Sequence, residues 1–131
     1  MTRTVGVLSL VAIAVFGIGW LIGASGRSDL EQQRRASAER AAFAEARAHV
    51  FEGRVSLYQL NFGAASQQFD RARSALEALQ ISLREEGSAE RAAHIEVALA
   101  RVRGAQQMAM SMDPNAQSAA EEAIRAIDAA R

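Results

Sequence analysis

The side chains best suited to chemistry are two histidines and several carboxylates, and their spacing assembles no recognisable site. His49 and His94 fall on different expected helices, and neither has a second ligand at the spacing of an HExxH or ExxH motif. No serine stands in a nucleophile elbow, and no glycine-rich phosphate loop is present. The absence of cysteine excludes disulfides, thiolate metal sites and cysteine nucleophiles. We therefore expect a non-enzymatic protein with no catalytic residue, no cofactor and no metal site.

Three methionines alternate near the C-terminal end, at Met108, Met110 and Met112. Thioethers can bind soft Cu(I). In a helix, however, Met108 and Met112 share one face while Met110 points away, so a single ion would not easily engage all three. Flexible methionine side chains also fill irregular gaps in a core or adapt to a partner. Packing or partner contact is the interpretation that we favour.

Charge and composition narrow the class of protein further. The 15 basic and 15 acidic residues cancel, which argues against nucleic acid as a partner, because phosphate binding needs a surplus of positive charge on one face. Every basic residue is arginine, as is typical of a GC-rich bacterial genome. A single proline, and few valines or threonines beyond the N-terminal stretch, argue against a β-sheet. The expected fold class is all-α.

An uncharged apolar run extends from Val5 to Ala24 and predicts a transmembrane helix. About 20 residues at a rise of ~1.5 Å span a hydrocarbon core of roughly 30 Å. Trp20, near the C-terminal end of the run, suits the membrane interface. We expect residues 1–26 to form a membrane anchor in the lipid bilayer. A cleaved signal peptide, ending in the small residues after position 23, is the alternative, although such apolar regions usually number about 7–15 residues.

The charges that flank the run bear on its orientation. Arg3 and the free amine precede it, whereas four arginines follow within the next turns: Arg27, Arg34, Arg35 and Arg40. The positive-inside rule then places the C-terminal domain in the cytoplasm of a bacterium, with a single pass through the inner membrane. Against this, short N-terminal tails often stay inside and send the following domain out, so a periplasmic domain is the alternative.

Beyond the anchor, hydrophobic periodicity predicts four helical segments. Residues 27–42 are polar nearly all round and form an expected stalk, within a long helix of residues 29–60 that begins at a cap on Ser28 or Asp29. Residues 43–131 form the expected domain. The long helix has one apolar row at Phe43, Val50 and Leu57, and a second beside it at Phe51, Val55, Tyr58 and Phe62.

Turn signals separate the remaining helices. Residues 61–63, Asn-Phe-Gly, are an expected turn because Asn and Gly tolerate positive φ. Helices are expected over residues 63–84, 89–110 and 116–131, with Gly87 as a C-terminal cap and Ser88 as an N-cap between the first two. Their apolar stripes are Ala65, Phe69, Ala72, Leu76, Leu79 and Leu83; then Ala92, Ile95, Leu99 and Val102; then Ala120, Ala123, Ile124 and Ile127.

The first of the two expected hairpins, residues 46–79, carries a spaced set of small and aromatic residues: Gly53, Phe62, Ala65, Phe69 and Ala72. Small residues let paired helices approach closely, and aromatic residues fill the space beside them. This arrangement resembles the tetratricopeptide repeat. It departs from the family pattern at three positions: His49 stands where Trp is preferred, Leu60 replaces a turn glycine, and Glu77 replaces a closing proline.

A fainter echo of the same spacing follows, at Gly104, Ala116, Ala120 and Ala123. The alternative to two repeats is a small four-helix bundle whose small residues match by chance. The resemblance implies that a protein or peptide binds in a groove between helices. Arg54, Tyr58 and Gln59 are the candidate contacts with such a partner.

These patterns predict a membrane-anchored, non-catalytic adaptor for protein–protein interaction. Solenoid repeats bury their faces against neighbours, and we expect the last helix to leave its Ala and Ile face uncovered, which suggests a homo-oligomer or a partner that completes the stack. Two alternatives are a structural membrane tether that self-associates and a small helical protein exported after signal cleavage.

Overall fold

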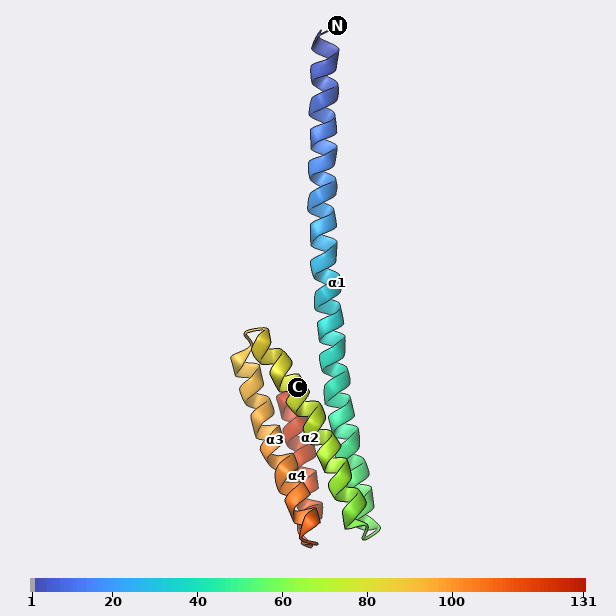
Figure 1. Cartoon of the computed structure of the whole chain (residues 1–131), viewed down its shortest axis with the longest axis vertical. Coiled ribbons are helices and arrows are strands. Elements are labelled where there is room, and N and C mark those ends of the chain that lie inside the picture. Colours follow the sequence, from blue (N-terminus) through green and yellow to red (C-terminus); the bar gives the residue numbers. More distant parts are fainter. Residues whose placement is uncertain (1) are drawn as a thin grey trace. The chain divides into compact units, whose positions relative to one another are not determined.

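The computed structural model contains four α-helices (Figure 1): α1 (Thr2–Tyr58), α2 (Phe62–Glu85), α3 (Ala89–Met110) and α4 (Ala116–Ala130). It describes the backbone of residues 2–131 and the side chains of residues 29–131. No strand occurs in the described backbone, which confirms the all-α prediction. The chain divides into two compact units, Met1–Ser37 and Ala38–Arg131, and the hydrophobic core lies in the second.

The predicted membrane span lies outside the side chains that the structure describes, and this includes Val5, Trp20 and Ala24. Over the described residues, no helical stretch has both the length and the apolar character needed to cross a bilayer. The predicted start of a new helix at Ser28 or Asp29 is wrong, because both residues lie inside α1. The sequence between the apolar run and the charged segment contains no proline, so every residue there can continue a helix.

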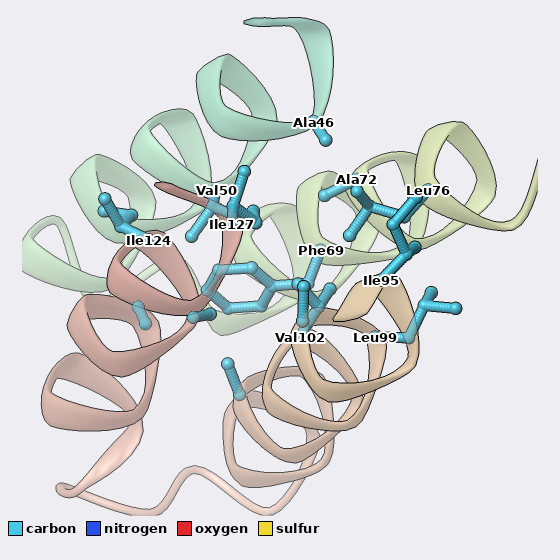
Figure 2. Packing of buried hydrophobic residues seen from close by; sticks show 14 of the residues in the cluster. Ala46, Val50, Phe69, Ala72, Leu76, Ile95, Leu99, Val102, Ile124 and Ile127 are labelled. Carbon is cyan, nitrogen blue, oxygen red and sulfur yellow. The ribbon is translucent and has the colours of Figure 1, made fainter. Parts of the chain in front are cut away.

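The core is built from the stripes that periodicity predicts. On α1, the row Phe43, Val50 and Leu57 is buried, as are the predicted stripes of α2 and α3. Helix α3 packs against both α2 and α4. Figure 2 shows side chains from all four helices meeting in one interior, with the ring of Phe69 between α4 and α3. Seven-residue spacing produces this result because two turns of helix return a side chain to nearly the same face.

The prediction of an uncovered face on α4 is wrong. Ala120, Ala123, Ile124 and Ile127 are all buried, and Figure 2 shows the two isoleucines directed toward the same interior as Val50 of α1. Two ion pairs join α1 to α4, Arg47–Asp128 at 2.9 Å and Arg54–Glu121 at 3.7 Å. The chain therefore covers this face itself, because α4 packs against α1 as well as α3.

All three connections between helices use the same hydrogen-bond pattern. Leu60, Gly87 and Met112 have φ values of 58°, 76° and 53°. In each case the amide of the next residue donates to a carbonyl five positions back, as from Asn61 to Ser56 at 2.8 Å. The positive-φ residue itself donates to a carbonyl three positions back. These are Schellman motifs, which satisfy carbonyl groups that the helix end leaves unpaired.

The predicted glycine cap at Gly87 is confirmed, whereas the turn before α2 lies earlier than expected. Leu60, rather than Gly63, adopts the left-handed conformation. Asn61 is the N-cap of α2, and its side-chain oxygen accepts a hydrogen bond from the amide of Ala64 at 3.0 Å. Gly63 consequently falls inside the first turn of α2, and the expected Asn-Phe-Gly turn is displaced by the stronger preference of asparagine for the N-cap.

Candidate interaction surface

The spacing of small and aromatic residues in the first hairpin produces a close contact between α1 and α2. Phe69 is fully buried, and a Cβ atom added to Gly53 would lie 2.6 Å from its Cε1 and 3.0 Å from its Cδ1. Carbon atoms prefer about 3.5–4.0 Å, so only glycine leaves room for the ring. Ala65 and Ala72, one turn to either side of Phe69, are also fully buried, and Phe62 is partly buried against the core. All five residues therefore lie in the core or against it.

The second set of small residues does not repeat this contact. A Cβ added to Gly104 would meet no atom within 4 Å. The position that corresponds to Phe69 is Ala120, which is buried but has no ring to press against α3. The second set of small residues therefore lies in the second hairpin without the close contact between a helix backbone and an aromatic ring that makes glycine necessary at position 53.

The candidate contact residues on α1 differ in how accessible they are. Tyr58 and Gln59 are exposed, while Arg54 is half-buried and paired with Glu121. The guanidinium of Arg54 also lies over the ring of Tyr58, at 5.8 Å from its centroid. Arg54 is thus engaged within the chain, and Tyr58 is the more available of the two for a partner.

An exposed apolar strip follows the outer side of α1. It consists of Phe51, Val55 and Tyr58, and we call it the α1 strip. The guanidinium of Arg47 lies 4.8 Å from the centroid of the Phe51 ring, while it pairs with Asp128 of α4. Three members of the predicted second row therefore face solvent, beside arginines that pair with α4. The fourth, Phe62, belongs to α2 and is partly buried against the core. Aromatic residues and arginine are the residues that protein interfaces favour.

A polar seam holds α2 against α3. Gln80 is buried, and its Nε2 donates to the carbonyl of Ala92 at 3.1 Å and to Oε2 of Glu96 at 2.7 Å. The hydrogen bond from Gln80 to Glu96, together with the nearby guanidinium groups of Arg103 and Arg84, holds the pKa of Glu96 below its ordinary value. These hydrogen bonds and the ion pairs of Arg84 with Glu96 and Arg103 with Glu77 join α2 to α3.

An open groove lies where the turn before α2 meets the turn before α4. Its lining is Leu60, Asn61, Phe62, Gly63, Ser66, Ala109, Met110 and Met112, and its volume is about 540 Å³. We call it the turn-end groove. Leu60, Met110 and Met112 are 76%, 68% and 69% exposed. The groove adjoins a second hollow of about 360 Å³, the polar groove, lined by Ser66, Gln67, Asp70, Arg71, Gln106 and Met110.

The methionine cluster divides between the core and this surface. Met108 is partly buried against the core, and Met110 and Met112 both line the turn-end groove. Two of the three thioethers therefore lie on an exposed apolar surface, an arrangement suited to adaptable contacts.

Neither histidine belongs to a chemical constellation. His49 Nδ1 lies 2.9 Å from Oε1 of Gln68, with Glu52 3.6 Å away, while His94 is exposed on α3. Across the described part of the chain, no group of three or more histidine and acidic side chains could hold a metal ion.

No family model matches this chain, and neither a curated protein nor a solved structure shows significant similarity to it.

The sequence alone does not predict the turn-end groove, although two features of the sequence are related to its lining. The alternating methionines point to partner contact, and Leu60 stands where a turn glycine is usual. Neither feature shows that the two turns lie together, because Leu60 and Met112 are distant in the chain. Only the packing of α3 on α2 brings them to one groove.

Proposed function

We propose that this protein is a membrane-anchored, non-catalytic adaptor whose helical domain binds another protein. The observation that carries the proposal is the distribution of exposed apolar side chains over residues 29–131. Of the nine large hydrophobic residues exposed there, six fall in residues 51–60 and 110–112. Three of the six form the α1 strip and three line the turn-end groove. Exposed apolar side chains that gather in this way mark interaction sites.

The anchor in this proposal is the apolar run of residues 5–24, which has the length and composition of a membrane span. We place the helical domain in the cytoplasm, on the strength of the arginines that follow the run. Tethering to the membrane would raise the effective concentration of a partner held at the same membrane, without any additional contact. This effect would let a modest apolar surface recruit its partner.

For the helical domain itself, we propose a closed four-helix bundle whose first hairpin packs in tetratricopeptide-like fashion. The contact between Gly53 and Phe69 supports the hairpin. The ion pairs of Arg47 and Arg54 with α4 favour closure of the bundle over an open array of repeats. In a closed bundle the partner binds on the outer surface, which makes the α1 strip the first candidate.

Photocrosslinking in intact bacteria tests the adaptor proposal. A benzophenone amino acid would replace Tyr58 in the α1 strip, and in a matched control it would replace Ile81, which is exposed on α2 outside both grooves. We expect a discrete heterologous product from position 58 and none from position 81. A product with twice the mass of this chain would instead support a self-associating tether. Equal products from both positions, or none from position 58, would contradict the proposal.

Topology is tested separately with a single cysteine in place of exposed Glu86, since the chain has no other cysteine. We expect the protein in the membrane fraction, with an impermeant maleimide reacting only after lysis. Labelling of intact spheroplasts would place the domain outside the cytoplasm. Recovery in the soluble fraction, with a mass lacking the first residues, would support the exported alternative.

A further inference from the structure

The turn-end groove and the polar groove form one continuous surface along α2 and α3. They share Ser66 and Met110, so the apolar part passes into the polar part without a break. The apolar part is lined by Leu60, Phe62 and the two exposed methionines, and the polar part by Asp70 and Arg71. One face of the bundle thus offers an apolar hollow followed by charged groups.

The backbone at the apolar part is held in a conformation that its residues disfavour. Leu60 and Met112 both have positive φ, where a residue with a Cβ costs roughly 1–2 kcal/mol relative to ordinary backbone. Gly87, at the equivalent position of the turn between α2 and α3, avoids this cost and lines neither groove. Strain of this kind is concentrated at functional sites. Large apolar side chains therefore occupy the two turns that border the groove, and glycine occupies the turn that does not.

The polar part carries one acidic and one basic side chain, Asp70 and Arg71, and they differ in how they are engaged. The carboxylate of Asp70 is already engaged, by Arg73 at 2.6 Å and by Gln106 at 3.4 Å. By contrast, no ion pair joins Arg71 to another side chain within residues 29–131, and Arg71 is exposed. An occupant that spans both parts would therefore gain most from a carboxylate placed against Arg71.

We propose that this surface binds a peptide segment of a partner protein, with a large apolar side chain in the turn-end groove and a carboxylate on Arg71. Gly63, which lines the turn-end groove, and Arg71 are separated along α2 by about 12 Å at ~1.5 Å per residue. An extended peptide covers that distance in roughly four residues. The matching segment therefore carries a Leu, Ile, Met or Phe about four positions from an Asp or Glu. This inference rests on the proposed adaptor function and names the chemistry of a partner segment that binds apart from the α1 strip.

Peptide selection on the full chain, held in lipid nanodiscs, tests this inference. The probe is a phage-displayed library of random dodecapeptides, and enriched sequences are resynthesised with a fluorescent label for anisotropy. We expect enriched peptides to share the apolar and acidic residues at this spacing. Arg71→Glu should weaken their binding by roughly tenfold or more, and Met110→Gln should do the same.

Matched variants keep the test specific. Arg101→Glu makes the same charge change on the far side of α3, where the arginine pairs with Glu122, and Ile81→Gln removes an exposed apolar group outside the grooves. Both should bind the peptides as the parent chain does. A second selection against Arg71→Glu should enrich Lys or Arg in place of the acidic residue, which a folding defect could not produce.

The inference fails if no peptide binds more tightly than about 100 μM, or if Arg71→Glu and Arg101→Glu have equal effects. It also fails if Met110→Gln abolishes dimerisation of the chain, which would make the groove a contact between two copies. Binding of peptide-free vesicles of neutral and anionic lipid by the solubilised chain, lost in Met110→Gln, would identify a lipid surface instead. Photocrosslinking at Tyr58 reports on the adaptor function independently, so it can succeed when the peptide inference fails.

Discussion

Replacing Gly53 and Gly104 with alanine should shift stability in opposite directions. Both glycines lie within helices, so the exchange gains about 1 kcal/mol of helix propensity at either site. Around Gly104 an added Cβ meets nothing within 4 Å, and we expect that gain in full. At Gly53 the Cβ would lie 2.6 Å from a carbon of the buried Phe69 ring, about 1 Å inside a normal contact.

Overpacking of this kind costs about 1–3 kcal/mol, because the ring is fully buried and rigid. The net effect of Gly53→Ala is therefore a loss of up to about 2 kcal/mol. The two variants should differ by about 1–3 kcal/mol, and a domain of this size shifts its Tm by roughly 4–8 °C per kcal/mol. Thermal and urea unfolding of the detergent-solubilised chain, followed by circular dichroism, measures the difference.

A double-mutant cycle with Phe69→Leu identifies the cause. The shorter side chain should make Gly53→Ala less costly, while it leaves the effect of Gly104→Ala unchanged. If Gly53→Ala proves as stable as Gly104→Ala, the close approach of α1 to Phe69 is absent and the reasoning is refuted. If Phe69→Leu does not couple to Gly53→Ala, the loss arises elsewhere.

Three further predictions concern the turns and the seam between α2 and α3. Leu60→Gly and Met112→Gly should each raise the free energy of unfolding by roughly 0.5–1 kcal/mol, since glycine adopts the left-handed conformation without strain and loses only a little more entropy on folding. A higher denaturation midpoint with an unchanged m-value would confirm this gain. Gln80→Ala should lower the free energy of unfolding by about 1–2 kcal/mol through loss of two hydrogen bonds to α3. An unchanged denaturation midpoint would show that these hydrogen bonds do not stabilise the fold. The pKa of Glu96 is lowered in the folded protein, so the ionised carboxylate stabilises the fold. This contribution to the free energy of unfolding is complete above the ordinary pKa of 4.5 and disappears as pH falls through the lowered pKa. Glu96→Gln should accordingly reduce the loss of stability below pH ~4.5 in acid titrations of the midpoint.

Local patterns accounted for most of the secondary structure. The helix expected over residues 89–110 has those bounds in the structure, and the one expected over residues 63–84 differs by one residue at each end. The failures have local causes as well. Asn61 is the N-cap of α2, so the turn before α2 lies earlier in the chain than expected. The absence of proline lets α1 continue past Ser28.

The exposed face predicted for α4 failed for a different reason. Ala120, Ala123, Ile124 and Ile127 have the spacing of a buried stripe, and sequence alone shows that such a stripe must be covered without showing by what. The structure covers it with α1 and α3, and ion pairs from Arg47 and Arg54 accompany that packing. Because α1 and α3 cover this stripe, it gives no reason to expect self-association through α4.

By itself, the sequence determined the fold class, the bounds of the last three helices to within about one residue and most of the buried stripes, because helix periodicity and capping act over only a few residues. Tertiary structure alone distinguished Gly53 from Gly104, since that difference depends on whether an aromatic ring from another helix lies against the backbone. It also brought Leu60 beside Met112 in one groove, with Arg71 farther along the same surface. Such arrangements depend on distances between residues far apart in the chain, which only the packing of whole helices decides.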